Sequence, residues 1–399
     1  MATTVTKVVD PNAGAGYDYD SLYDWEAAQQ GDLTGVRDEI AVAKCRCTAG
    51  TADTTAVSIA GWTTSATQYI KVWTDTAESY RHNGTYQTGN KYRIVLANAY
   101  AVHMYLTNYI RFDGIQIYVS AGNGNYQPPV YIEGIAATNN RVDFTNCILR
   151  GHGGAYFNSA MMLSASGREN LNIVNCVIYG FDTTETNSRG LVLSGATQNV
   201  YNTTVIGGYI GIQQTAGTVT AKNCYAGGQG LGGSYSGTIT MTTCASGDTT
   251  GTAGLQSIAL NTTNFTNVTA GSEDFHLPSG SALIGAATNL YNDAAYPFQD
   301  DIDSQDRGGA AASWDIGADE YVSSASIEQE GFRFRNDDGS ESAATWKANQ
   351  DTNISLAADT AFRLRFLLKA TGNPDSIDAQ AEARVKPSGG AFGAWEKIN

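Results

Sequence analysis

Positive charge is scarce in this sequence of 399 residues. Charged residues make up 16%, and 24 lysines and arginines stand against 39 acidic residues, which gives a formal net charge of -15. A protein that binds nucleic acid needs a basic footprint for the phosphate backbone, so this balance argues against that class. An acidic surface instead repels polyanions and limits non-specific adhesion.

Long hydrophobic runs are also missing. No apolar stretch approaches the roughly 18 residues that a membrane-spanning helix requires. The N-terminal stretch MATTVTKVVDPNAG lacks the charged-then-apolar pattern of a signal peptide. We therefore expect no membrane insertion and synthesis in a cytoplasm, so that an extracellular role would come through assembly into a particle or through lysis.

Proline is rare, with 7 residues, whereas glycine (44) and tyrosine (22) are frequent. This composition predicts β-structure with tight turns. The chain is too long for one ordinary core, but a repeat array can accommodate its length.

Cysteines number six, and we expect them to be free thiols in a cytoplasmic product. Cys45 and Cys47 form a C-x-C pair, but no second pair or nearby histidine completes a zinc site. The four histidines show no ligand spacing. The sequence therefore predicts no metal and no cofactor at these residues.

One ten-residue pattern recurs five times. When the copies are aligned on the cysteine position, they are 29, 28, 20 and 20 residues apart, as in a solenoid with loops of varying length. The copies read VDFTNCILRG (142–151), LNIVNCVIYG (171–180), NVYNTTVIGG (199–208), VTAKNCYAGG (219–228) and ITMTTCASGD (239–248).

Alternation within each copy predicts which side chains face the core. Val142 and Phe144 point inward before a bend, and after the bend Cys147 and Leu149 face inward again. Small apolar cysteines suit a dry interior column, and stacked asparagines at the bend satisfy turn backbone groups. The predicted core ladder is Cys147, Cys176, Thr204, Cys224 and Cys244, with Asn146, Asn175, Thr203, Asn223 and Thr243 at the bends; Arg150, Tyr179 and Tyr225 face outward.

This pattern resembles the right-handed parallel β-helix of pectate-lyase-like proteins over roughly residues 40–322. YDSLYDWEAAQQGDL (19–33) predicts an amphipathic helix, at the place where a solenoid needs an end plug. DFHLPSGSALIGAA (274–287) and DIDSQDRGGAAASWDIGADEY (301–321) are similar to the closing segment of bacterial and phage β-helix proteins. That segment usually reads D-x-x-G-x-x-R before D-I-G-A-x-E, and Ser304 replaces the usual glycine here.

The composition changes after the polar linker VSSASIEQE (322–330). Alternation at Phe332 and Phe334, and again from Phe362 to Phe366, predicts strands of a small β-sandwich, with a hairpin at NDDG. FRFRNDDGSESAATW resembles modules of tailed-phage structural proteins, and DYDSLYDWEAAQ with DTTAVSIAGWTT resembles phage and prophage β-helix proteins. The predicted all-β organisation is a cap segment (1–39) with a helix, a right-handed parallel β-helix (40–322), a linker (323–330) and a β-sandwich-like domain (331–399).

These resemblances imply a structural surface protein of a tailed-phage virion: a fibre, spike or head-decoration protein that projects a rigid rod. The partners implied are other virion proteins, through residues 331–399, further copies of the chain (a trimer being one option) and a host surface glycan. The alternative is a polysaccharide depolymerase, either a lyase or a glycoside hydrolase, on the same scaffold.

Polysaccharide cleavage requires paired carboxylates or a calcium-bound acidic cluster. The outward column after the bend carries no carboxylate pair, so we expect no catalytic residues there. Scattered acids remain elsewhere, and nothing in their spacing forces them together. They are Asp113, Glu133 and Asp143, and Asp182 and Glu185 beside Arg189 in one loop.

Two further sites rest on residue chemistry. DDIDSQDR (300–307) offers Asp300, Asp301 and Asp303 to calcium, but it lacks the glycine and distal glutamate of an EF-hand. We favour end-cap carboxylates that bond backbone N–H groups and Arg307. Exposed tyrosines with small polar neighbours suit glycan contact, and the predicted contact residues are Tyr126, Arg150, Tyr156 and Tyr179.

Overall fold

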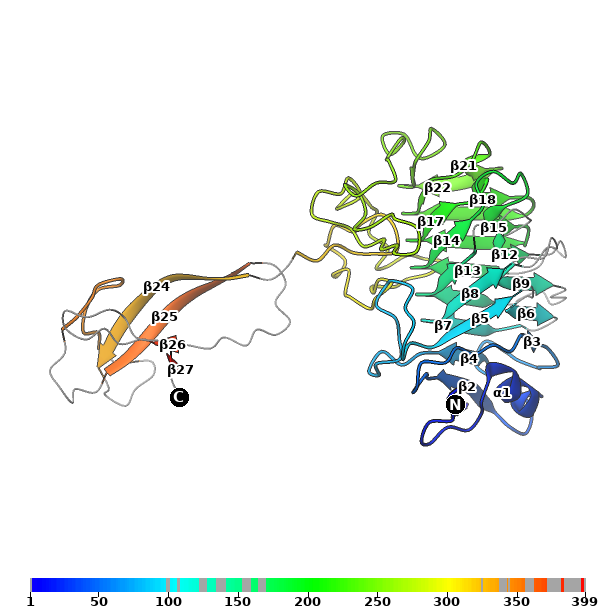
Figure 1. Cartoon of the computed structure of the whole chain (residues 1–399), viewed down its shortest axis with the longest axis horizontal. Coiled ribbons are helices and arrows are strands. Elements are labelled where there is room, and N and C mark those ends of the chain that lie inside the picture. Colours follow the sequence, from blue (N-terminus) through cyan, green and yellow to red (C-terminus); the bar gives the residue numbers. More distant parts are fainter. Residues whose placement is uncertain are drawn as a thin grey trace. The chain divides into compact units, whose positions relative to one another are not determined.

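The structure is a computed structural model of the whole chain. It describes residues 2–97, 101–105, 108–121, 128–133, 141–152, 159–163, 170–323, 326–336, 343, 345–355, 362–371, 382–383 and 396–397. The chain divides into two compact units, Met1–Tyr321 (unit 1) and Val322–Asn399 (unit 2), which are described separately (Figure 1).

Unit 1 is nearly all β-structure and contains three long parallel sheets. The nine-stranded sheet has the order β1-β2-β4-β7-β10-β13-β16-β19-β22. Its strands are β1 (Thr3–Val9), β2 (Glu39–Cys45), β4 (Ile70–Trp73), β7 (Ile110–Asp113), β10 (Val142–Thr145), β13 (Asn170–Val174), β16 (Thr197–Tyr201), β19 (Thr218–Lys222) and β22 (Ile239–Thr242).

The other two sheets have seven strands each. The second sheet contains β5 (Arg93–Ala97), β8 (Gln116–Ala121), β11 (Ile148–Arg150), β14 (Val177–Phe181), β17 (Thr204–Gly207), β20 (Tyr225–Gly227) and β23 (Ala245–Ser246). The third contains β3 (Val57–Ile59), β6 (Val102–Tyr105), β9 (Val130–Glu133), β12 (Ser159–Leu163), β15 (Arg189–Leu193), β18 (Ile210–Gln214) and β21 (Gly233–Ser236).

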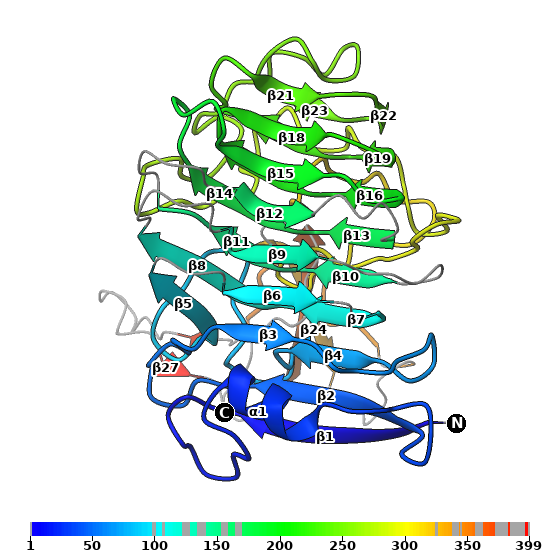
Figure 2. The same ribbon diagram turned by 90° about the vertical axis from the view of Figure 1, so that its right-hand side faces the viewer.

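From β7 onward the chain adds strands to the three sheets in a fixed order, first, second, third. Each such set of strands is called a rung, and Figure 2 shows the rungs stacked above one another. Parallel pairing keeps equivalent residues of successive rungs side by side, about 4.8 Å apart. This arrangement is consistent with a β-helix-like solenoid, and it confirms the predicted all-β parallel architecture in this coarser form.

The cysteine column lies in the core as the repeat predicts. Cys147, Cys176, Cys224 and Cys244 are all fully buried in one hydrophobic cluster that runs through the body. All six cysteines are free thiols.

The register corrects one member of this column. Thr204 pairs with Val177 on one side and Tyr225 on the other, so it points outward with them. Thr203 therefore takes the cysteine position, where its hydroxyl donates to the carbonyl of Tyr201 at 2.9 Å. The sequence alignment was wrong by one residue in this rung because the rung has two adjacent threonines and no cysteine to fix its frame.

The bend before the cysteine column has the same backbone conformation in five rungs. Asn146, Asn175, Asn202, Asn223 and Thr243 all have positive φ, between 42° and 55°. Asparagine tolerates this left-handed region better than most residues, which explains its repetition. Asn202, rather than Thr203, thus occupies the bend of its rung, and Asn223 Nδ2 donates to its Oδ1 at 2.9 Å.

Among the described residues one helix is present, α1 (Leu22–Gln29), and it lies beside the first strands of the body (Figure 2). Ser21 caps it, its hydroxyl accepting a bond from the Asp24 N–H, and Leu22 and Trp25 are buried. The helix was predicted, but the parallel sheet already begins at β1, inside the segment expected to be only a cap. No described helix is long and apolar enough to cross a membrane.

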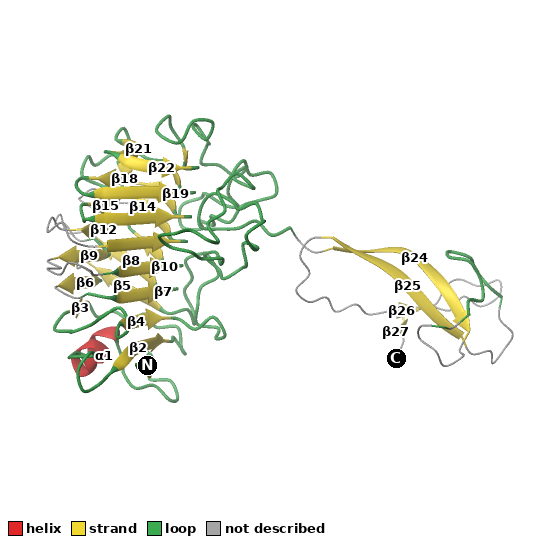
Figure 3. Cartoon of the chain, turned by 180° about the vertical axis from the view of Figure 1, so that it is seen from behind, coloured by secondary structure: helices red, strands yellow, loops and turns green. Residues whose placement is uncertain are grey.

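The strands of unit 1 end at Ser246, well before residue 322. Residues 247–321 form turns and isolated bridges, which Figure 3 draws as loops. They do not add rungs as expected. Their apolar side chains instead pack on the outward side of the second sheet, where Phe265, Phe275, Leu283 and Ile316 join Ile148, Val177, Tyr179, Ile206 and Tyr225 in one buried cluster.

Unit 2 contains one long antiparallel pair, β24 (Ser326–Asn336) with β25 (Phe362–Thr371), and one short pair, β26 (Glu382–Ala383) with β27 (Glu396–Lys397). β24 begins inside the segment that we assigned to a linker. The predicted strands around Phe332 and Phe366 are therefore present, whereas the complete β-sandwich stays a prediction.

Candidate functional site

The predicted glycan residues do not form an open site among the described residues. Tyr126 and Tyr156 lie outside the residues that the structure describes. Tyr179 is only 3% exposed and packs edge-on against Phe275, with 5.2 Å between ring centroids. Because residues 247–321 cover this side of the second sheet, Tyr179 presents no ring face to a sugar. The prediction of glycan contact is therefore wrong for Tyr179.

Arg150 is held in the same covered region. Its guanidinium lies over the rings of Tyr86, Tyr118 and Tyr179 at 5.0, 4.9 and 5.5 Å, and one nitrogen is 3.8 Å from the Glu273 carboxylate. These contacts give Arg150 a structural role in attaching the covering segment.

Local partners are present for three of the scattered acids, Asp113, Glu133 and Asp182. Asp182 accepts bonds from the N–H groups of Thr184 and Glu185, which lowers its pKa against the opposing effect of burial. Arg189 donates to Gln213 at 2.7 Å. Asp113 contacts Arg81 at 2.8 Å, and Glu133 contacts His103 at 3.2 Å.

The 300–307 segment forms end-cap bonds of the type that we favoured. Asp301 accepts from the N–H groups of Asp303, Gln305 and Glu320 at 3.1, 2.8 and 3.0 Å. Arg307, 2% exposed, donates to Glu320 at 2.9 Å and to several backbone carbonyls. This network connects residues 300–307 of the covering segment to residues near its C-terminal end.

A cluster of three carboxylates adjoins this network. Ligand atoms of Asp301, Asp303 and Asp319 lie within 4.8 Å of one another. His276 is 3.7 Å from Asp303 and 3.9 Å from Asp319. Burial disfavours the imidazolium, but the aspartates around it outweigh this and raise the pKa of His276 to about 11. The protonated ring therefore supplies positive charge beside the carboxylates.

Polar side chains gather instead on the outward side of the nine-stranded sheet. Asp143, Asn172 and Asn199 occupy one register position in three successive strands, β10, β13 and β16. Asn172 Nδ2 donates to Asp143 at 2.7 Å, and Asn199 Nδ2 donates to Asn172 at 2.8 Å. The bonds fix the orientation of all three side chains, and we call this row the polar ladder.

Two arginines flank the polar ladder at Asp143. Arg141 Nε donates to both carboxylate oxygens, at 2.9 and 2.8 Å, and Arg111 Nε lies 3.7 Å from one of them. The Arg111 guanidinium stacks over the Tyr69 ring at 3.8 Å, and that of Arg141 lies over Tyr296 at 5.1 Å. Aromatic rings and one carboxylate thus hold both arginines in place.

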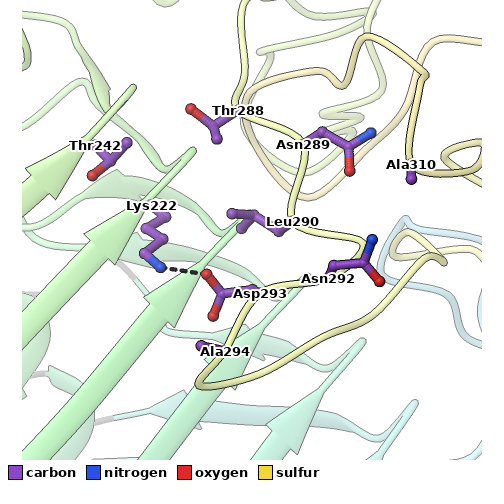
Figure 4. A pocket seen from close by; sticks show the side chains of 9 residues that line it. All are labelled: Lys222, Thr242, Thr288, Asn289, Leu290, Asn292, Asp293, Ala294 and Ala310. Carbon is purple, nitrogen blue, oxygen red and sulfur yellow. Dashed lines mark hydrogen bonds and ion pairs between the residues drawn. The ribbon is translucent and has the colours of Figure 1, made fainter.

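A cavity of about 490 Å³ opens beside the polar ladder. A second cavity, of about 440 Å³, lies further along the same sheet and is shown in Figure 4. There, Lys222 of β19 pairs with Asp293 of the covering segment. The first cavity is lined by Ala66, Tyr109, Arg141, Asn170, Asn172, Thr197, Asn199 and Ala295, and the second by Lys222, Thr242, Thr288, Asn289, Leu290, Asn292, Asp293, Ala294 and Ala310.

This chemistry suits recognition of a polyhydroxylated ligand. Amides, hydroxyls and a guanidinium in fixed positions can bond sugar hydroxyls, since each offers directed donors or acceptors. The sequence places Asp143 and Asn172 at the second position of their copies, but Asn199 at the first position of the next copy. The frame of that copy was wrong by one residue, so the alignment did not bring Asn199 into line with the other two. Comparison with known proteins finds no match, whether with family models, curated proteins or solved structures.

Proposed function

We propose that this chain is a structural surface protein of a tailed-phage particle, and that it contacts a host saccharide. In this proposal unit 1 is a right-handed parallel β-helix that projects from the particle, and unit 2 attaches it to other particle proteins. The resemblances of the N-terminal, closing and C-terminal segments to phage proteins support the setting. Three parallel sheets around one continuous core support the projecting role, because such a body is stiff along its stacking axis.

The observation that carries the saccharide contact is the polar ladder with its adjoining cavity. Asn172 is 6% exposed and Asp143 is 1% exposed, so the row is built into the surface and not spread over mobile side chains. The sequence predicted glycan contact on the side of the second sheet, which is covered. The saccharide site proposed here lies on the outward side of the nine-stranded sheet.

The alternative function is a polysaccharide depolymerase, and a cleavage assay distinguishes it from a non-enzymatic surface protein. Asp143 is the carboxylate of the polar ladder, and it is bound by Arg141 and Asn172. The lining of the first cavity, all within the described residues, includes no carboxylate that could form an acid–base pair with Asp143. Incubation with host polysaccharide should release no new reducing ends. Cleavage that disappears in Asp182→Asn or Asp143→Asn would establish the depolymerase instead.

Particle incorporation tests the structural role. The full chain and a chain ending at Tyr321 are expressed during phage production, and purified particles are examined by mass spectrometry and by electron microscopy with antibody against unit 1. We expect the full chain on the particle surface. We expect the shortened chain to fold, by circular dichroism, yet to be absent from particles. Failure of the full chain to incorporate would overturn the proposal, and incorporation of the shortened chain would overturn the role of unit 2.

A further inference from the structure

The outward side of the nine-stranded sheet brings two arginines to one carboxylate, on a unit that is acidic in total. Residues 322–399 hold 9 of the 24 basic and 11 of the 39 acidic residues, which leaves 15 and 28 for residues 1–321. Five of those 15 basic residues lie on or beside this one sheet: Lys44, Lys71, Arg111, Arg141 and Lys222. Carboxylates pair with the three lysines, whereas the two arginines share Asp143.

The strongest local excess is at Asp143. This one carboxylate, 1% exposed, faces two guanidiniums, so the group of three carries one net positive charge. The side chains of Arg111 and Arg141 are 37% and 42% exposed, which leaves part of each guanidinium accessible to a ligand. Arg141 uses Nε for both bonds to Asp143, and it also lines the cavity.

The cavity lining has the same bias. It contains one guanidinium, the amides of Asn170, Asn172 and Asn199, the Thr197 hydroxyl and the Tyr109 phenol, and no carboxylate. The carboxylate that pairs with this guanidinium, Asp143, is not part of the lining. The second cavity differs, because Asp293 neutralises Lys222 there.

We propose that the cavity beside the polar ladder selects an anionic saccharide, with Arg141 binding its carboxylate and the asparagines bonding its hydroxyls. This inference rests on the saccharide contact proposed above and adds the chemical class of the ligand. Asp143 is a positioning residue: it holds Arg141 and Arg111 against the sheet, with Tyr69 and Tyr296 stacked on their guanidiniums. Guanidinium–carboxylate pairs are charge-assisted and directional, which favours a carboxylated sugar over a neutral one. The acidic surface elsewhere opposes this only weakly, since fields are screened beyond about 8–10 Å at physiological salt.

Binding of matched acidic and neutral oligosaccharides tests this selectivity. Titration calorimetry uses the full chain with oligogalacturonate, hyaluronan oligosaccharide and oligosialate, each also in its carboxyl-reduced form. We expect at least one acidic ligand to bind, its reduced form to bind about tenfold or more weakly, and added salt to weaken the acidic form only. Equal affinity for both forms, or preference for the reduced form, would overturn the anionic selectivity but leave saccharide contact standing. Binding of no member of the panel would count against saccharide contact itself.

Two variants distinguish the position of the Arg141 guanidinium from the net charge of the protein as the cause of binding. Arg141→Gln should lower affinity for the acidic form about tenfold or more and leave the reduced form unchanged. Arg189→Gln on β15 removes the same charge from the third sheet and should change neither; an equal loss there would point to net charge alone.

Asp143→Asn adds net positive charge, so a purely electrostatic site would bind the acidic form more tightly. We expect weaker binding, because the two arginines lose their anchor. Tighter binding would refute the positioning role, and unchanged thermal unfolding of each variant shows that the fold is intact. Should Asp143→Asn unfold, Tyr69→Leu, which removes the ring stacked on Arg111, gives the same comparison without a buried change of charge.

Discussion

Arg307 Nη1 lies 2.9 Å from Glu320 Oε2, and both residues lie near the C-terminal end of the segment that covers the second sheet. Arg307 also donates to the Ala318 carbonyl at 2.6 Å and to Asn175 Oδ1, at the bend of a rung, at 3.2 Å. One buried guanidinium thus connects the repeat to its closing segment. The resemblance of residues 274–287 and 301–321 alone predicted a closing segment here.

Removal of Arg307 should therefore destabilise unit 1 strongly. Arg307→Met leaves Glu320 buried without its cation and leaves several carbonyls unpaired, at a cost of about 3–5 kcal/mol in the free energy of unfolding. The double variant Arg307→Met/Glu320→Gln should lose less than Arg307→Met alone, because no charge is left unpaired. Urea unfolding of the four proteins of this cycle measures the coupling. A double variant as unstable as the sum of both single variants would show that the pair is not coupled.

The cysteine column gives a second test of the core. Native protein should leave Cys147, Cys176, Cys224 and Cys244 unmodified by a thiol reagent, with reaction only on unfolding, because all four are fully buried. Cys176→Asp should cost several kcal/mol by burying an unpaired charge, whereas Cys176→Ala should cost much less. Rapid labelling of all four thiols in the native protein would contradict their interior position.

The two adjacent threonines distinguish the corrected register from the one that the sequence suggested. The Ala318 N–H donates to Thr204 Oγ1 at 3.0 Å on the outward side, so Thr204→Val should cost about 1–3 kcal/mol by leaving that donor unpaired. Thr203→Cys places the repeat's usual residue in the inward column and should change stability by less than about 1 kcal/mol. Chemical denaturation compares the two, and the reverse order of effects would restore the first alignment.

Residue alternation carried most of what the sequence predicted. Cys147, Cys176 and Asn146 repeat in one frame, and parallel stacking turns such a frame directly into columns, so the core could be assigned from local pattern alone. The frame failed only where Thr203 and Thr204 left it ambiguous. Within this unit, pattern was sufficient wherever a distinctive residue marked the position.

Long-range packing could not be predicted in the same way. Tyr179 alternates outward as expected, but its burial depends on Phe275, almost a hundred residues later, in a segment without periodicity. Polar pairing across rungs was visible only in part. Asn172 and Asn199 share a register position, but the bond from Asn172 to Asp143, and the two arginines beside Asp143, follow from strand pairing that the loop lengths obscure. The candidate site therefore emerged from the structure rather than from the sequence.

Ser304 gives a test of backbone conformation at the closing segment. Its φ is 74°, in the left-handed region, at the position where similar segments usually have glycine. Ser304→Gly should raise stability by up to about 1 kcal/mol, since relief of the left-handed conformation exceeds the added entropy of the unfolded chain. Ser279→Gly, at an exposed position without positive φ, is the matched control and should be neutral or destabilising. A shift in unfolding midpoint that is the same for both would reject the conformational explanation.

His276 predicts how stability depends on pH on the alkaline side. The aspartates around it outweigh the effect of burial and raise its pKa from 6.5 to about 11 in the folded state. Between these values the folded protein holds a proton that the unfolded chain has lost. The stabilisation is therefore complete below pH 6.5 and declines as pH rises toward 11, by at most about 1.4 kcal/mol per pH unit for one group.

The titration of Asp301 also lowers the stability of the folded protein as the pH rises. Burial, with Asp303 beside it, raises the pKa of Asp301 from 3.8 to about 9, so its contribution also falls as pH rises through that range. Urea unfolding from pH 6 to pH 9 should show decreasing stability, and His276→Gln should flatten the decrease above pH 6.5 while the slope due to Asp301 remains. Lys91→Gln, a change in a half-buried lysine that donates to the Ser79 carbonyl, should keep the full decrease. Stability that rises from pH 7 to pH 9 in the unmodified protein would contradict a protonated His276 among these aspartates.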